Sequence, residues 1–153
     1  MPDSHSWALV SVRVKSAGAT RSTAFVRRKQ FTIGKPITFD REDPEISAVE
    51  FLAAAAAADV AATLRKVARE RRVAIDEMEV VAHGEFNNAL AFLGVVGEEG
   101  EASLKSLHLK VYLSTGAPDA EVQAAWQAAQ DRSPLTTTLR RCVDLSLELQ
   151  ISH

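Results

Sequence analysis

Asp59 is the residue of this sequence whose surroundings most strongly suggest chemistry. It follows a run of six alanines in the stretch FLAAAAAADVAATL, residues 51–64, which has the composition of a buried helix. Aspartate is a poor helix former, and an ionised carboxylate is costly to bury without a partner. Two interpretations are open: Asp59 is paired with a structural partner, or it faces a cavity as a ligand-binding group or a general base.

Three other residues are candidates for a site with Asp59. Glu50 closes the tetrapeptide SAVE, residues 47–50, in which a serine and a glutamate three positions later form a capping box at a helix start. Ser133 stands before a proline, a pattern typical of a helix cap followed by a first-turn proline. Thr136 lies in the same short helix. Capping alone accounts for Glu50 and Ser133; the alternative is that all three line a binding pocket beside Asp59.

The sequence offers little for metal or disulfide chemistry. Its single cysteine, Cys142, excludes an internal disulfide and any paired-cysteine redox or zinc motif. A small, semi-buried side chain is the favoured interpretation of Cys142, with a nucleophilic thiol as the alternative. The four histidines are scattered without the spacing of metal ligands. We therefore expect no metal and no cofactor.

Length and charge narrow the class of protein further. A chain of 153 residues is large enough for one domain with a real core. Its 18 basic and 20 acidic residues give a net charge of −2, which offers no overall electrostatic case for a nucleic-acid partner. The start of the chain lacks the pattern of a signal peptide, and Asp59 interrupts the longest apolar run well short of a membrane span. We expect a cytoplasmic protein with no membrane partner.

The elements that must position these residues follow from hydrophobic periodicity. Alternation predicts strands at 7–15, 24–28, 31–34, 79–84, 103–113 and 143–151, and helical patterns predict helices at 47–71, 116–132 and 134–141. The first strand should bury one face, and Asp119 should cap the second helix. Strands and helices are segregated, so the class is α+β, in one domain over 1–153. Its parts are an N-terminal β meander (1–45), a central helix (47–71) and a C-terminal α+β part (79–151).

This order of elements and three segments resemble the OsmC/Ohr family of stress-related thiol peroxidases and their uncharacterised relatives. The segments are FTIGKPITFDREDPEISAVEFLAAAAAA (31–58), RERRVAIDEMEVVAHGEF (69–86) and AAQDRSPLTTTLRRCVDLSLEL (128–149). The resemblance implies an OsmC-like fold in which long central helices are wrapped by antiparallel sheets. It also implies an intertwined homodimer with its sites at the dimer interface. The alanine-rich helix and the strands offer more apolar surface than one such chain covers, which also favours a homodimer.

The resemblance places the family's two cysteines at positions that are not thiols here. The peroxide-attacking cysteine of the central helix aligns with Asp59, and the resolving cysteine, which precedes a proline, aligns with Ser133. A carboxylate and a hydroxyl cannot perform the cycle from sulfenate to disulfide. The family's arginine-orienting glutamate aligns with Val49, beside Glu50, and Arg21 is one candidate for the arginine.

Several functions remain open from the sequence. The leading hypothesis is an OsmC-like homodimer that is not a cysteine-based peroxidase, with an interface pocket of Asp59, Glu50, Ser133 and Thr136 that binds a small molecule or is vestigial. The alternatives are a peroxide reductase-related stress enzyme that uses Cys142, an acid-base enzyme that uses Asp59, and a purely structural or interaction protein.

Overall fold

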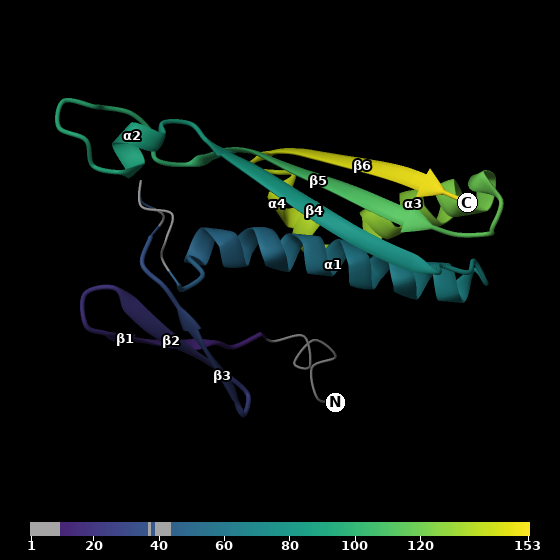
Figure 1. The fold of residues 1–153 in the computed structure, drawn as a ribbon, viewed down its shortest axis with the longest axis horizontal. Coiled ribbons are helices and arrows are strands. Elements are labelled where there is room, and N and C mark those ends of the chain that lie inside the picture. The colour runs from purple at the N-terminus through teal and green to yellow at the C-terminus, as the bar shows by residue number, and fades with distance from the viewer. Residues whose placement is uncertain (1–9, 37, 39–43) are drawn as a thin grey trace, which may run out of the picture. The chain divides into compact units, whose positions relative to one another are not determined.

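The computed structural model describes residues 10–36, 38 and 44–153, and the chain forms two compact units (Figure 1). Unit 1 extends to Phe51, and unit 2 runs from Leu52 to His153. The strands are β1 (Arg13–Ala17), β2 (Arg21–Val26), β3 (Lys29–Ile33), β4 (Glu77–Phe86), β5 (Leu104–Ser114) and β6 (Asp144–Ser152), and the helices are α1 (Ala48–Glu70), α2 (Ala89–Phe92), α3 (Asp119–Arg132) and α4 (Pro134–Leu139). This content confirms the predicted α+β class. The single domain over 1–153 stays a prediction.

Unit 1 contains an antiparallel meander in the order β1-β2-β3, as the N-terminal pattern predicts. The β1–β2 turn contains Gly18 at a φ of 74°, a backbone conformation that glycine adopts without strain. The predicted first strand, 7–15, is correct only in its last part, because β1 begins at Arg13; residues 7–9 lie outside the described residues. Its predicted burial is wrong as well, since Val12 and Val14 are 50% and 54% exposed.

Helix α1 begins where the capping box predicts. The backbone N–H and the hydroxyl of Ser47 both donate to Glu50 Oε2 at 2.8 Å, and the Glu50 N–H donates back to Ser47 Oγ at 3.3 Å. These bonds satisfy amide groups that have no partner inside the helix. The helix then runs for 23 residues, or about 34 Å at the standard rise per residue.

Helix α1 ends in a Schellman motif. The N–H of Val73 donates to the carbonyl of Ala68 at 2.8 Å, and the N–H of Arg72 donates to the carbonyl of Arg69 at 3.1 Å. Arg72 has a φ of 60°, in the left-handed region where glycine is strongly preferred. The buried side chains of Val73 and Ala68 are the apolar residues that accompany this motif.

Unit 2 contains a three-stranded sheet in the order β4-β5-β6. Strands β4 and β5 pair antiparallel, whereas β5 and β6 pair in parallel. The prediction of antiparallel sheets is therefore confirmed for β4 with β5 and is wrong for the pairing of β5 with β6. The reason is that α3 and α4 form the long crossover between β5 and β6, which returns the chain to the end of the sheet where β5 begins.

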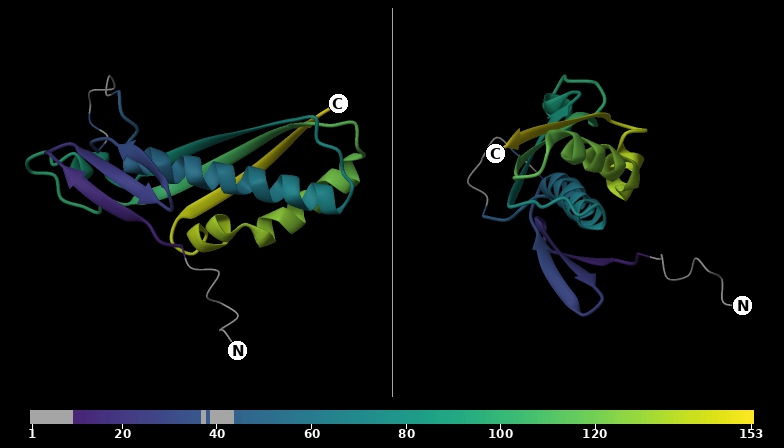
Figure 2. Two further views of the ribbon diagram at one scale, coloured as in Figure 1. Left: turned by 90° about the horizontal axis from the view of Figure 1, so that it is seen from below. Right: turned by 90° about the vertical axis from the view of Figure 1, so that its right-hand side faces the viewer.

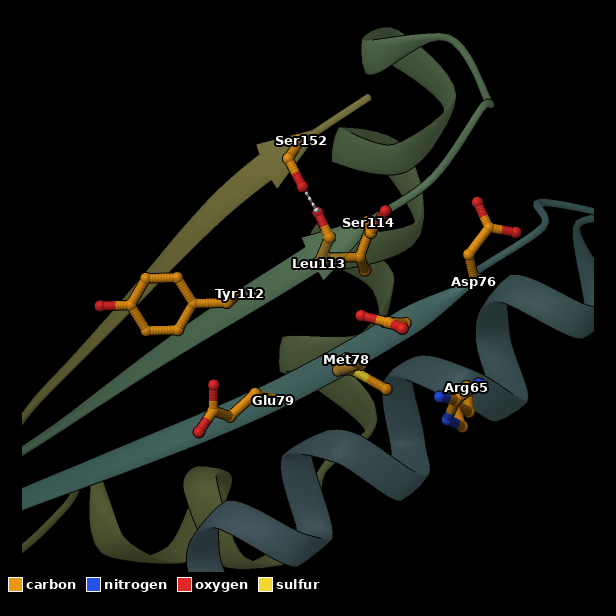
Figure 3. Close-up of a pocket in the computed structure, with 9 residues that line it drawn as sticks. Arg65, Asp76, Met78, Glu79, Tyr112, Leu113, Ser114 and Ser152 are labelled. Carbon is orange, nitrogen blue, oxygen red and sulfur yellow. Dashed lines mark hydrogen bonds between the residues drawn. The ribbon is translucent and has the colours of Figure 1, made fainter.

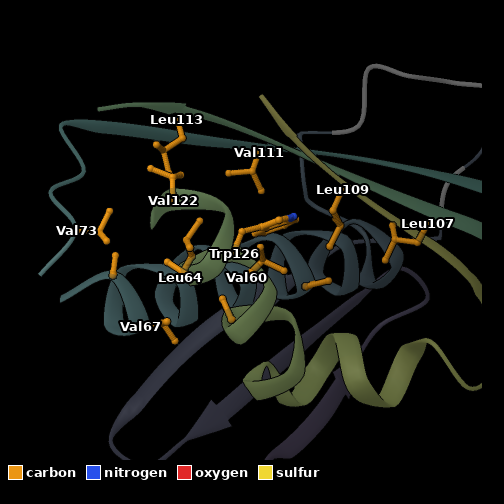
Figure 4. Packing of buried hydrophobic residues seen from close by; sticks show 14 residues of the cluster. Val60, Leu64, Val67, Val73, Leu107, Leu109, Val111, Leu113, Val122 and Trp126 are labelled. Carbon is orange, nitrogen blue, oxygen red and sulfur yellow. The ribbon is translucent and has the colours of Figure 1, made fainter. Parts of the chain in front are cut away.

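The core of unit 2 lies between one face of this sheet and the helices α1 and α3, which cover that face (Figure 2). Leu107, Leu109, Val111 and Leu113 alternate along β5 and are at most 2% exposed. Figure 4 shows them packed above side chains of α1 and α3, which include Val60, Leu64, Val67, Val122 and Trp126. The buried stripe of α1 thereby fixes which side of the helix faces the sheet.

The helix predicted at 116–132 forms as α3, but its N-cap differs from the prediction. Pro118, rather than Asp119, is the N-cap of α3, and in the described part of the chain no side chain makes a capping hydrogen bond there. Asp119 lies in the first turn, where its carboxylate accepts a hydrogen bond from His153 Nε2 at 2.8 Å. Within the described residues, no helix combines the length and apolarity that a membrane crossing requires.

Candidate functional site

The candidate site is built at the start of α4, where the serine and proline pattern predicts a helix cap. Ser133 is the N-cap in extended conformation, and its Oγ accepts a hydrogen bond from the N–H of Thr136 at 3.4 Å. The serine side chain is almost fully buried, at 1% exposed. The predicted cap is thus confirmed, and it fixes the direction in which the hydroxyl of Ser133 points.

Asp59 joins this cap to the central helix. Its Oδ2 accepts one hydrogen bond from the hydroxyl of Ser133 and another from the N–H of Leu135 at 3.0 Å. Asp59 and Ser133 are 74 positions apart in sequence. The carboxylate therefore serves as a second cap for α4 and ties α1 to it. This geometry is the structural partnership that the sequence left as one of two options for Asp59.

Thr136 lies in the same cluster, but its hydroxyl is turned toward the backbone. The side chain is fully buried, and Oγ1 lies 3.4 Å from the carbonyl oxygen of Gln130 and 3.3 Å from that of Ser133. Both carbonyls accept from the one hydroxyl proton. Thr136 therefore supports the turn between α3 and α4, and a direct contact with a ligand stays a prediction.

One oxygen of the Asp59 carboxylate is left for another partner. Both hydrogen bonds within the described structure end on Oδ2, and Oδ1 accepts none there. Among the described residues, no side-chain oxygen is both sealed from solvent and without a hydrogen bond, so Oδ1 is reachable by solvent. An ionised carboxylate only accepts hydrogen bonds. The site can therefore receive a hydrogen-bond donor or a cation, held in place by an anchored carboxylate.

The remaining sequence candidates make other contacts. Glu50 belongs to unit 1, where its carboxylate completes the capping box, and its role in a binding site stays a prediction. Arg21, also in unit 1, pairs with Glu45 at 3.6 Å. Cys142 is exposed just after α4, and its Sγ lies 3.5 Å from the carbonyl oxygen of Leu139. The predicted semi-buried position of Cys142 is therefore wrong, because the chain turns at the surface before β6 begins.

Metal ligation has no structural support in the part of the chain that is described. There, no three histidine, cysteine, aspartate or glutamate side chains are grouped as metal ligands would be. The cluster at Asp59 contains a single carboxylate with hydroxyl and amide donors. The hydroxyl and the amide N–H donate hydrogen bonds to the carboxylate, whereas a hard metal ion needs several oxygen ligands.

Sequence reasoning missed a pocket of about 510 Å³ at the end of the unit 2 sheet where β4 begins. It is lined by Arg65, Asp76, Glu77, Met78, Glu79, Tyr112, Leu113, Ser114 and Ser152. Figure 3 shows Arg65 on α1 near the start of β4, with Ser114 and Ser152 at the adjoining ends of β5 and β6. Four separate elements form this pocket, so no single motif in the sequence indicates it. Asp59 does not line it.

A family model identifies the family of this chain, and solved structures share its fold. The family model described as OsmC-like protein matches residues 41–148. The crystal structure of an OsmC-like protein from Mycoplasma pneumoniae superposes with a TM-score of 0.79 at 15% identity, covering 95% of this chain and 98% of that one.

Two further solved structures carry names that concern hydroperoxide resistance. An organic hydroperoxide resistance protein OsmC from Legionella pneumophila gives a TM-score of 0.68 at 17% identity, covering 93% of this chain and 98% of that one. The organic hydroperoxide resistance protein OhrB of Bacillus subtilis gives 0.63 at 19% identity, with the same coverage of the two chains. No curated protein matches the sequence. At these identities the structures show the fold alone.

Proposed function

The chain belongs to the OsmC-like protein family, and from that premise we propose that it is a homodimer that binds a small hydrogen-bond donor at Asp59 and does not reduce peroxides through cysteine. The observation that carries this proposal is the bond between Asp59 and Ser133. These are the two positions that the family resemblance assigns to the peroxide-attacking and resolving cysteines. Here they hold each other as an acceptor and a donor, and neither atom can be oxidised and reduced as a thiol can.

The chemistry of the site selects the class of ligand. Oδ2 of Asp59 is held by two donors, and Oδ1 is open to solvent. A ligand that presents a primary amine, a guanidinium group or a primary amide would complete the acceptor capacity of this carboxylate. Such a ligand would bind without any rearrangement of the anchored oxygen, because Ser133 and Leu135 already fix the side chain.

The homodimer is supported by apolar surface that the chain leaves exposed. In unit 1, Val12, Val14 and Phe31 are 50%, 54% and 40% exposed. In unit 2, α1 has an exposed face that contains Leu52, Ala55, Ala58 and Ala62. Small side chains along a helix allow a second helix to approach closely. Light scattering at micromolar concentration should give twice the mass of the chain, and a monomer would refute this part of the proposal.

The peroxidase alternative rests on Cys142, and one assay decides it. Consumption of an organic hydroperoxide with a dithiol reductant is measured for the wild type and for Cys142→Ser. We expect no enzymatic turnover by either protein, because no basic or cationic side chain among the described residues is bonded to the exposed thiol. Turnover that the substitution abolishes would show that Cys142 performs the chemistry, and the proposal would then be wrong.

The ligand is tested by thermal unfolding with a panel of small amines, guanidines and amides. Asp59→Asn is the matched control, since an asparagine oxygen accepts the bonds from Ser133 and Leu135 while its NH₂ group replaces the open acceptor with a donor. Compounds that raise the unfolding temperature of the wild type and not of the variant would support binding at Oδ1. If no compound separates the two proteins, Asp59 is a structural cap only. The cytoplasmic location and the lack of a nucleic-acid partner stay predictions.

A further inference from the structure

The last turns of α1 and the turn that follows carry a dense cluster of positive charge that the proposed function does not use. Arg65, Lys66, Arg69, Arg71 and Arg72 are five cations within eight positions, and all are exposed. Among the described residues, none of the five takes part in an ion pair. The helix dipole favours a cation in the last turn, which accounts for Arg69 but not for the whole cluster. Arg72 also occupies a backbone conformation that favours glycine.

This cluster borders a shallow pocket with an apolar floor, which we call the arginine pocket. It has a volume of about 180 Å³ and is lined by Arg65, Ala68, Arg69, Val73 and Ile75. The three apolar residues come from α1 and from the segment that leads to β4, and the two arginines come from α1. The arginine pocket is therefore suited to a small apolar side chain that is followed by carboxylates.

The connection between β4 and β5, residues 87–103, has that chemistry, and we call it the β4–β5 tip. Val96 is 100% exposed, and Leu90 and Val95 beside it are 41% and 38% exposed. The turn is shaped by Gly94 and Gly97, which have φ values of 71° and 87°. Glu98, Glu99 and Glu101 follow directly, and all three are exposed. The β4–β5 tip therefore presents exposed apolar side chains followed by carboxylates. The arginine pocket of the same chain has basic side chains and an apolar floor.

The β4–β5 tip is held in shape by its own contacts. The Asn88 side chain accepts a hydrogen bond from the N–H of Ala91 at 3.0 Å and caps α2. The rings of Phe86 and Phe92 stack with centroids 4.8 Å apart. An ordered protrusion loses less conformational entropy on docking than a flexible one. Apolar side chains that are exposed together on one protrusion, as Leu90, Val95 and Val96 are, are a feature of interaction sites.

The two features lie at opposite ends of unit 2, so one copy cannot join its own tip to its own pocket. Figure 1 shows α2 and the β4–β5 tip at one end of the sheet and the last turn of α1 at the other, and Figure 2 agrees. A two-fold axis that runs perpendicular to α1 and passes through its exposed alanine face would place the helices of two copies antiparallel. Each tip would then reach the pocket end of the other copy, and the contact would occur twice, as a closed symmetric dimer requires.

We propose that, in the homodimer, the β4–β5 tip of each copy docks in the arginine pocket of the other, with Val96 on the apolar floor and Glu98, Glu99 and Glu101 against Arg65 and Arg69. This inference rests on the dimer of the proposed function and assigns the contacts that fix its register. Complementary charge selects the antiparallel arrangement, because a parallel pair would bring tip to tip and pocket to pocket with like charges opposed.

The test uses charge reversal in the full chain. One variant carries Glu98→Lys, Glu99→Lys and Glu101→Lys, and the other carries Arg65→Glu and Arg69→Glu. Each alone opposes like charges at both contacts, and we expect its dimer dissociation constant to rise by about tenfold or more. In an equimolar mixture of the two, every tip meets a pocket of opposite charge, so the heterodimer should form with nearly wild-type affinity. Native mass spectrometry measures the amounts of the monomers, the two homodimers and the heterodimer.

A matched control changes the same number of arginines elsewhere. Arg140→Glu with Arg141→Glu alters exposed residues after α4 and should leave dimerisation unchanged. If both charge-reversed variants dimerise with the dissociation constant of the wild type, this inference is wrong and the proposed dimer is unaffected. The same holds if both variants are weakened but their mixture does not recover. A monomeric wild type would overturn the proposed dimer together with the inference.

Discussion

Replacing Asp59 by alanine should destabilise the protein through the loss of two hydrogen bonds at the start of α4. The carboxylate accepts from the hydroxyl of Ser133 and from the N–H of Leu135 at 3.0 Å. A bond to a charged acceptor contributes about 1.5–3 kcal/mol, and water can replace part of it at the partly exposed Asp59. Ser133 is 1% exposed, so its hydroxyl loses a partner that water cannot easily replace. We expect a loss of about 2–4 kcal/mol in the free energy of unfolding.

Two further variants separate the bond from the rest of the site. Asp59→Asn keeps an oxygen for both donors and loses only the charge, so it should cost about 1 kcal/mol. Ser133→Ala removes both its bond to Asp59 and its own cap to Thr136. In a double-mutant cycle, Asp59→Ala and Ser133→Ala should show a coupling of about 1–2 kcal/mol, which isolates the bond between the two side chains.

The assay is urea unfolding followed by far-ultraviolet circular dichroism at one fixed protein concentration, because dimerisation makes stability depend on concentration. Equal stability of the wild type and Asp59→Ala would refute the structural role that the geometry gives to this carboxylate. A full effect of Asp59→Asn, as large as that of Asp59→Ala, would show that charge and not hydrogen-bond acceptance is the stabilising property.

Three further predictions follow from particular contacts. Arg72→Gly should raise the free energy of unfolding by about 1 kcal/mol in the same urea assay, since Arg72 has a φ of 60°; a loss of stability would mean that its side chain has a stabilising role. The double variant Asp59→Cys with Ser133→Cys should form a disulfide on oxidation, which raises the free energy of unfolding by up to about 4 kcal/mol because it closes a loop of 74 positions. A thiol assay that finds three free cysteines after oxidation, Cys142 included, would contradict the contact between these two positions. The hydrogen bond to Asp119 and then the backbone bond to Thr115 raise the pKa of His153, so their stabilisation is complete below the unfolded-state pKa, about 6.5, and is lost as pH rises through the folded value. Proton NMR should therefore find a titration midpoint above that value for His153 and a lower one in Asp119→Asn.

Much of the local structure could be predicted from the sequence because its causes are local. The capping box of Ser47 and Glu50 forms as the tetrapeptide predicts, and Ser133 caps α4 one residue before its proline. Both depend on atoms within three positions of each other, so the rest of the chain has little influence on them. The prediction failed for Asp119, where a proline took the cap position. It also failed for the burial of Val12 and Val14, which depends on what covers a strand and not on the strand's own period.

The sequence by itself determined that the chain has a single cysteine, and therefore no pair of thiols, and that a carboxylate stands in an alanine-rich helix. Only the tertiary structure decided what that carboxylate contacts. The bond from Ser133 to Asp59 joins residues 74 positions apart, and the parallel pairing of β5 with β6 likewise depends on the crossover through α3 and α4. Contacts of this range arise when elements pack against a shared core, and a residue's neighbours in sequence carry no record of which side chain it will meet there.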